Sequence, residues 1–211
     1  MLSALCAQTS VPDASSSDPL PMLRVHAPDD PQRAEVEAFI WQVYAQRYGA
    51  DVQHYAPTLV SLSDDHGIVA AAGYRCASSG PLFLERYFDA PIEMLLASST
   101  NTAPARDRII EVGHLSAARA GAGRHLICLL ARHLQSLPHD WVVSTMTTGL
   151  RHMFLRMGIR PWALGVADPD ALGPEAAQWG RYYEHHPIVL AGRLPQALSL
   201  LTRHGSSTEP A

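Results

Sequence analysis

The sequence contains no lysine, so arginine supplies all 16 of its basic side chains. Together with 20 acidic residues they give a formal net charge of −4, and no basic stripe runs along the chain. A protein that binds nucleic acid neutralises the phosphate backbone with clustered lysine and arginine. We therefore expect no nucleic-acid partner.

Cysteine and long apolar runs are also scarce. Cys6, Cys76 and Cys128 lie far apart, without the close pairs that mark zinc or redox sites, and we expect them to be free thiols of a reducing compartment. Apolar runs such as 68–72 fall far below the roughly 18 residues of a membrane helix. The Leu-Ser-Ala-Leu-Cys start is too short for a secretory signal, and no basic segment precedes it. These absences predict a soluble, cytoplasmic protein that is not integral to a membrane.

The length and the composition of the two ends predict a single folded unit. A chain of 211 residues suits one domain with a sizeable core. Residues 1–21 are rich in Ser, Asp and Pro, and we expect a disordered leader there. The folded domain is then expected over 22–204, and 205–211 is expected to be a flexible tail.

The hydrophobic pattern alternates between strand and helix periods. A helix is expected that Asp30 caps and Gly49 ends. Other helices are expected over 81–87, 91–97, 123–137, 149–157 and 195–204, and strands over 23–26, 58–63, 67–75, 109–115, 141–146, 162–166 and 187–192. An Asp-Asp-His-Gly turn joins the second and third strands as a hairpin. This order predicts an α/β (α+β) fold with a mixed sheet covered on both faces.

A glycine-rich loop with two arginines lies between the strand at 109–115 and the following helix. Helix N-termini present unpaired N–H groups and a partial positive charge, which favour an anion. Gly121 and Gly123 allow close approach of the backbone. Arg119 and Arg124 add charged donors that suit a phosphate. We interpret residues 119–124 as a phosphate-binding loop, although a tight turn with solvated charges is the alternative.

Glu111 stands inside an otherwise apolar strand. A carboxylate is costly to bury without a partner, so Glu111 either acts in catalysis or pairs with an arginine such as Arg75 or Arg108. A polar cluster at 182–186 ends in two adjacent histidines. Neighbouring side chains of a strand point to opposite faces, so we expect no metal site there.

Several segments carry a family resemblance. Val-Tyr-Ala-Gln-Arg-Tyr-Gly-Ala, Ala-Ala-Ala-Gly-Tyr-Arg, Pro-Leu-Phe-Leu-Glu-Arg-Tyr, Ile-Glu-Val-Gly-His-Leu and Trp-Gly-Arg-Tyr-Tyr resemble the bacterial thermostable hemolysin family over about 23–194. The element order is similar to that of GNAT acyltransferases and acyl-homoserine-lactone synthases. The resemblance implies a mainly antiparallel central sheet. It also implies an N-acyltransferase that uses an acyl-CoA or acyl-carrier-protein thioester and a small-molecule amine, such as an amino acid.

The same resemblance implies roles for individual residues. Glu111 is the expected general base and His114 the second choice. Arg75 is expected to face an acceptor carboxylate. The donor is expected to contact Gly113, Leu115, Arg119, Ala120, Gly121, Ala122, Gly123 and Arg124, and the acceptor Tyr44, Arg75, Phe83 and Trp179.

Two positions depart from the GNAT pattern. Phe154 occupies the position of the usual tyrosine that protonates the leaving thiolate, and Ala118 replaces a Gln or Arg before the glycine loop. A non-catalytic scaffold that binds a thioester or a protein therefore stays as an alternative, as does the membrane-active, lytic protein that the family name suggests. Acyl carrier protein and a second copy of the chain are candidate partners.

Overall fold

The computed structural model describes residues 22–100 and 102–205, with the side chains of 99, 100 and 202–205 left out. The expected leader, Cys6 and the tail from residue 206 onwards lie outside the described residues. Gly205, expected in the tail, belongs to the C-terminal helix.

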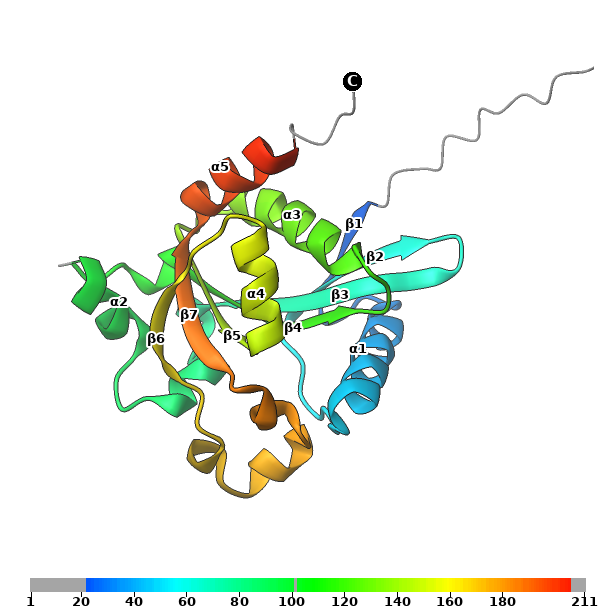
Figure 1. Ribbon diagram of the computed structural model, residues 1–211, viewed down its shortest axis with the longest axis horizontal. Coiled ribbons are helices and arrows are strands. Elements are labelled where there is room, and N and C mark those ends of the chain that lie inside the picture. The colour runs from blue at the N-terminus through cyan, green and yellow to red at the C-terminus, as the bar shows by residue number, and fades with distance from the viewer. Residues whose placement is uncertain (1–21, 101, 206–211) are drawn as a thin grey trace, which may run out of the picture.

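Within the described residues, seven strands form one sheet in the order β1-β2-β3-β4-β5-β7-β6 (Figure 1). All neighbours are antiparallel except β4 and β5, which are parallel. The strands are β1 (Leu23–His26), β2 (Thr58–Asp64), β3 (Gly67–Cys76), β4 (Ile109–Ala117), β5 (Trp141–Met146), β6 (Trp162–Val166) and β7 (Ile188–Arg193). This confirms the predicted mixed, mainly antiparallel sheet.

The first helix ends where the sequence predicts and begins later. In α1 (Arg33–Tyr48) the chain turns out of the helix at Gly49, whose φ of 66° favours glycine. The N-cap is Gln32, so the prediction of Asp30 as the cap is wrong. The Asp30 carboxylate instead accepts a hydrogen bond from the Gln32 N–H at 2.8 Å. A short carboxylate that bonds two residues ahead makes a turn before the helix.

The remaining helices lie close to their predicted ranges. They are α2 (Ile92–Thr100), α3 (Ala122–Gln135), α4 (Thr148–Arg156) and α5 (Leu194–Gly205). The segment predicted as a helix over 81–87 is a 3-10 turn, η2 (Phe83–Tyr87). Four further 3-10 segments have no counterpart in the prediction: η1 (Ala77–Ser79), η3 (Arg106–Arg108), η4 (Pro169–Trp179) and η5 (Tyr182–His185).

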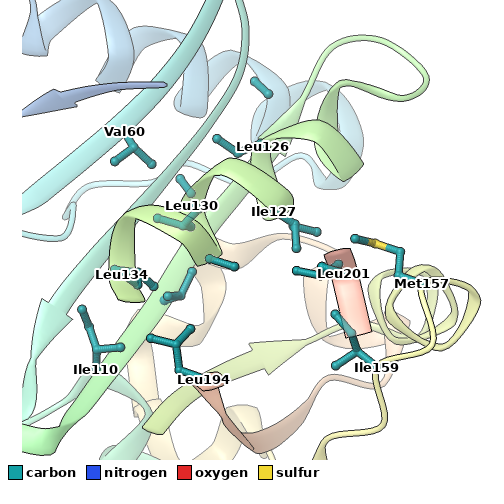
Figure 2. Packing of buried hydrophobic residues seen from close by; sticks show 14 of the residues in the cluster. Val60, Ile110, Leu126, Ile127, Leu130, Leu134, Met157, Ile159, Leu194 and Leu201 are labelled. Atoms are coloured by element: carbon teal, nitrogen blue, oxygen red, sulfur yellow. The ribbon is translucent and has the colours of Figure 1, made fainter. Parts of the chain in front are cut away.

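Helices cover both faces of the sheet, as expected from the alternation of strand side chains. On β3, Ala70 and Ala72 belong to the core under α3, whereas Ala71 belongs to the core under α1. Figure 2 shows the first of these cores, in which side chains of α3 pack with residues of the sheet, of α5 and of the segment that follows α4. The labelled members are Val60, Ile110, Leu126, Ile127, Leu130, Leu134, Met157, Ile159, Leu194 and Leu201.

The parallel pair β4–β5 is only partly joined. Their register runs from the pair of Ile109 with Trp141 to the pair of Glu111 with Val143. Beyond Glu111, β4 continues beside β3 while β5 continues beside β7. The two strands therefore form a fork whose open end begins at Glu111.

Candidate active site

A cavity of about 560 Å³ occupies the fork between β4 and β5. Its walls come from Arg75 of β3, from β4 and β5, and from the N-terminal part of α3, the helix α4 and the end of α1 with the loop that follows. The segments η2, η4 and η5 also line it. Every site residue predicted from the sequence lines it except Ala122: Tyr44, Arg75, Phe83, Glu111, Gly113, His114, Leu115, Arg119, Ala120, Gly121, Gly123, Arg124 and Trp179. The fold thus brings the predicted donor and acceptor residues to one cavity.

Glu111 lies at the base of the fork and is 9% exposed. Its Oε2 accepts a hydrogen bond from the Phe83 N–H at 2.9 Å, and its Oε1 accepts one from the Leu84 N–H at 3.0 Å. Burial raises the pKa of this carboxyl above its ordinary value, although the two N–H groups and the charge of Arg75 act in the opposite direction. A carboxylate with a raised pKa is a stronger base at neutral pH.

Neither arginine proposed as a structural partner holds the Glu111 carboxylate. Arg108 donates to both carboxylate oxygens of Asp140, at 2.9 and 2.8 Å. Arg75 is the cross-strand neighbour of Glu111. The hydrogen bond that the Arg75 guanidinium makes within the described chain goes to the Pro81 carbonyl, at 3.3 Å.

His114 sits in a bulge of β4. Between the pairs Ala71–Ser116 and Gly73–Gly113, β4 contains one more residue than β3, and His114 has a φ of 55°. A bulge leaves the extra residue out of the ladder, and such strained backbone clusters at functional sites.

The His114 ring is neutral at physiological pH. Burial lowers the pKa of His114 to about 4. Its Nε2 lies 3.1 Å from the carbonyl of His54, which assigns the proton to Nε2. Nδ1 is buried without a hydrogen-bond partner in the described chain. His114 therefore offers a lone pair of low basicity.

The glycine-arginine loop leads from β4 into α3, with Gly121 as the N-cap at a φ of 85°. The N-terminus of α3 lines the cavity, and its unpaired N–H groups are chemically suited to an anion. Arg124 lines the cavity and is exposed. Arg119 forms an ion pair with Asp64 at the β2–β3 hairpin, and no local sequence pattern indicates this contact.

Aromatic rings from α1, η2, η4 and η5 also line the cavity. Tyr44 and Tyr182 stack with their centroids 6.2 Å apart, and Trp179 lies 5.5 Å from the ring of Phe83. Residues 182–185 form the 3-10 segment η5, so the alternation of strand side chains used to argue against a metal site does not apply to them. Across 22–100 and 102–205, no group of three or more His, Cys, Asp or Glu residues could hold a metal ion.

A second, smaller cavity of about 80 Å³ lies under α5 and is lined almost entirely by apolar side chains. It shares four lining residues with the larger one: Val112, Leu115, Ile127 and Ser144. Phe154 lines this smaller cavity and not the larger one. Ser144 is 2% exposed, and its Oγ has no hydrogen-bond partner within the described residues. No sequence signal pointed to Ser144, because a serine in a strand is ordinary.

Comparison with known proteins agrees with this architecture. The family model for thermostable hemolysin matches residues 26–198. No curated protein sequence matches the chain. Within the described residues, none of the helices has the length and apolar character needed to cross a membrane.

Solved structures share this fold, and two of the three described below are named as synthases. TofI in an apo form has 17% identity and a TM-score of 0.61, covering 86% of this chain and 96% of TofI. FeeM, an N-acyl amino acid synthase from uncultured soil microbes, has 11% identity and a TM-score of 0.58, with coverage of 88% and 97%. BjaI, a CoA-dependent acyl-homoserine lactone synthase with SAM and isopentyl-CoA, has 13% identity and a TM-score of 0.61, with coverage of 91% and 92%. The chain belongs to the thermostable hemolysin family and shares its fold with TofI, FeeM and BjaI.

Proposed function

We propose that this protein is an N-acyltransferase, which moves an acyl group from the thioester of acyl-CoA or acyl carrier protein to the amine of a small molecule such as an amino acid. The observation that carries the proposal is the single cavity in the β4–β5 fork. It is lined by a helix N-terminus with arginines, by a buried carboxylate, by Arg75 and by aromatic rings. FeeM and BjaI, which share the fold, are named as synthases of acylated products.

The donor is expected to bind at the glycine-arginine loop. A phosphate of the pantetheine arm accepts hydrogen bonds from the backbone N–H groups at the start of α3 and from Arg124. The arm then extends along β4, where the bulge at His114 frees backbone N–H groups to polarise the thioester oxygen. The apolar cavity beyond Ser144 suits the hydrocarbon part of the acyl group.

The acceptor is expected to bind at the other end, beside Glu111 and Arg75. A guanidinium with unused N–H donors suits a carboxylate. The aromatic wall of Tyr44, Phe83 and Trp179 suits an apolar side chain. An amino acid combines these two features.

The chemistry follows from these positions. The amine nitrogen attacks the thioester carbon and forms the new C–N bond, while Glu111 accepts the proton that the amine releases, directly or through water. The C–S bond then breaks, and the thiolate leaves with a proton. Glu111 suits the role of base better than His114, because its pKa is raised whereas that of His114 is lowered to about 4. Phe154 provides no proton for the thiolate, so the proton comes from another group or from water.

The direct test is incubation of the pure protein with acyl-CoA or acyl carrier protein, in separate reactions, and a mixture of amino acids. Release of free thiol, together with an N-acyl product found by mass spectrometry, is the expected result. Thiol release without an acylated amine would indicate thioester hydrolysis instead. Donor binding without any thiol release would favour the non-catalytic scaffold.

A further inference from the structure

One arginine holds the segment that connects β3 to β4. Arg106 Nη1 donates to Glu85 Oε1 at 2.7 Å and to Glu93 Oε2 at 2.5 Å. Its Nη2 donates to Glu85 Oε2 at 3.1 Å and to the Gly80 carbonyl at 3.0 Å, and its Nε donates to the Ala77 carbonyl at 2.9 Å. These contacts use every N–H donor that a guanidinium has, so a single side-chain geometry satisfies them all.

Glu85 links Arg106 to the backbone through two further hydrogen bonds. Its Oε2 accepts a hydrogen bond from the Leu82 N–H at 2.7 Å, and its Oε1 accepts one from the Ile92 N–H at 2.8 Å. Burial opposes ionisation of Glu85, but the hydrogen bonds from Arg106 and from the backbone hold its pKa below the ordinary value. Glu85 is therefore a charged anchor for the first turn of η2.

The same turn provides the hydrogen bonds to Glu111. Three consecutive N–H groups at the start of η2 are divided between two carboxylates: Leu82 donates to Glu85, and Phe83 and Leu84 donate to Glu111. The backbone conformation that satisfies Glu85 is thus the one that presents two donors to Glu111.

We propose that Arg106 is a positioning residue for Glu111, acting through Glu85 to hold the N–H groups of Phe83 and Leu84 at the Glu111 carboxylate. The inference rests on the role of Glu111 in the proposed function. Arg106 does not line the cavity, so its influence on the reaction passes through the turn. Its charge also offsets that of Glu85, which would otherwise disfavour ionisation of Glu111.

The other groups that face Glu111 are not among the hydrogen-bond partners of the Arg106 guanidinium. Arg75 on β3 favours the ionised form. Tyr87 on η2 stays neutral because burial raises its pKa, and its hydroxyl lies 2.7 Å from that of Tyr183. On β5 the register neighbour of Glu111 is the uncharged Val143. Loss of Arg106 therefore has two effects on Glu111. It weakens the hydrogen bonds from the η2 backbone, and it leaves the negative charge of Glu85 without its positive partner. Both effects raise the pKa of Glu111.

The test measures the Glu111 carboxyl itself. We would titrate protein labelled with ¹³C at the glutamate carboxyls by NMR and assign Glu111 from the signal lost in Glu111→Gln. In Arg106→Gln the midpoint of the Glu111 titration is expected to rise by about one pH unit or more. The matched control is Arg108→Gln, two residues away in the same 3-10 segment and also paired with a carboxylate. It should leave the midpoint unchanged.

A second variant keeps the proposal testable if Arg106→Gln does not fold. Arg106→Lys keeps the charge but cannot bridge both glutamates and two carbonyls, so a smaller rise is expected. An unchanged midpoint in a folded Arg106→Gln protein would overturn the proposal, and an unchanged midpoint in Arg106→Lys would do so if Arg106→Gln does not fold.

Activity gives an independent measurement. If the protein transfers acyl groups, the rising limb of its pH–rate profile should shift with the NMR midpoint. If no thiol is released, the proposed function fails, while the titration still decides whether Arg106 positions the carboxylate.

Discussion

Glu111 and Arg75 are directly opposite each other on β4 and β3, yet the carboxylate takes its hydrogen bonds from the backbone of η2. Within the described residues, the Arg75 guanidinium makes one hydrogen bond, to the Pro81 carbonyl. Glu111 is thus held in place without a salt bridge that would depress its basicity. Arg75 keeps donors for a second anion at the same end of the cavity.

The first prediction concerns Glu111 as a base. Glu111→Gln keeps the size of the side chain and removes the proton acceptor, so kcat/KM for acyl transfer should fall by about 10²- to 10⁴-fold. The assay is release of free thiol from the acyl donor. Glu35→Gln, on the exposed side of α1, serves as the control and should retain full activity. A Glu111→Gln protein with undiminished kcat/KM would exclude Glu111 as the base.

Glu111 should also make stability depend on pH. Because its pKa is higher in the folded protein than in the unfolded chain, its contribution to stability is greatest below the unfolded value. That contribution declines as the pH rises through the folded value. The Tm of Glu111→Gln relative to the wild type should therefore increase between pH 4 and pH 8. Thermal unfolding followed by circular dichroism at several pH values measures this difference, and a constant difference would contradict the raised pKa.

Arg75 should recognise the acceptor through a carboxylate. Arg75→Ala is expected to raise the KM of an amino-acid acceptor by tenfold or more, since charge-assisted hydrogen bonds contribute about 1.5–3 kcal/mol. The KM of the corresponding amino-acid amide should change little, because the amide has no carboxylate to lose. Steady-state kinetics with the two acceptors decide the point. An equal increase in KM for both acceptors would show that Arg75 maintains the structure of the site and does not bind the carboxylate.

The sequence predicts those parts of the fold that depend on local signals. Gly49 ends α1 and the Asp-Asp-His-Gly turn forms the β2–β3 hairpin, because both conformations are set by a few adjacent residues. Glu111 was found for a similar reason, since one carboxylate in an apolar strand stands out. The glycine-arginine loop can also be identified from a few adjacent residues.

The rest of the site depends on contacts between distant residues. Glu85 and Arg106 are 21 positions apart, and Arg119 meets Asp64 across a still longer separation. Residues 169–185 form short 3-10 segments without a helical or strand period, so the pattern did not place Trp179 or Tyr182 in an element. Such tertiary contacts leave no periodic trace in a single sequence.

A cross-strand pair of glycines should respond in opposite ways to alanine. At Gly73 a Cβ atom would lie 2.8 Å from Ala56 Cβ and 3.0 Å from Leu59 Cδ2. Gly73→Ala should therefore lower the free energy of unfolding by roughly 1–3 kcal/mol. At Gly113, its partner in the ladder, nothing lies within 4 Å of the added Cβ, and Gly113→Ala should be neutral or slightly stabilising. Urea unfolding of both variants tests the pair, and equal losses would show that crowding is not the cause.

The donor phosphate should distinguish the two arginines of the loop. Arg124 is exposed at the cavity, whereas Arg119 is already paired with Asp64. Arg124→Gln is expected to raise the KM for acyl-CoA by about tenfold or more. Arg119→Gln should have a smaller effect, since Arg119 must first leave Asp64. Asp64→Asn removes this competition and should lower the KM. An S-acyl pantetheine without a phosphate gives the control, because its KM should be the same for all three variants and the wild type. If Arg124→Gln impaired the phosphate-free donor equally, the loop would act on something other than a phosphate.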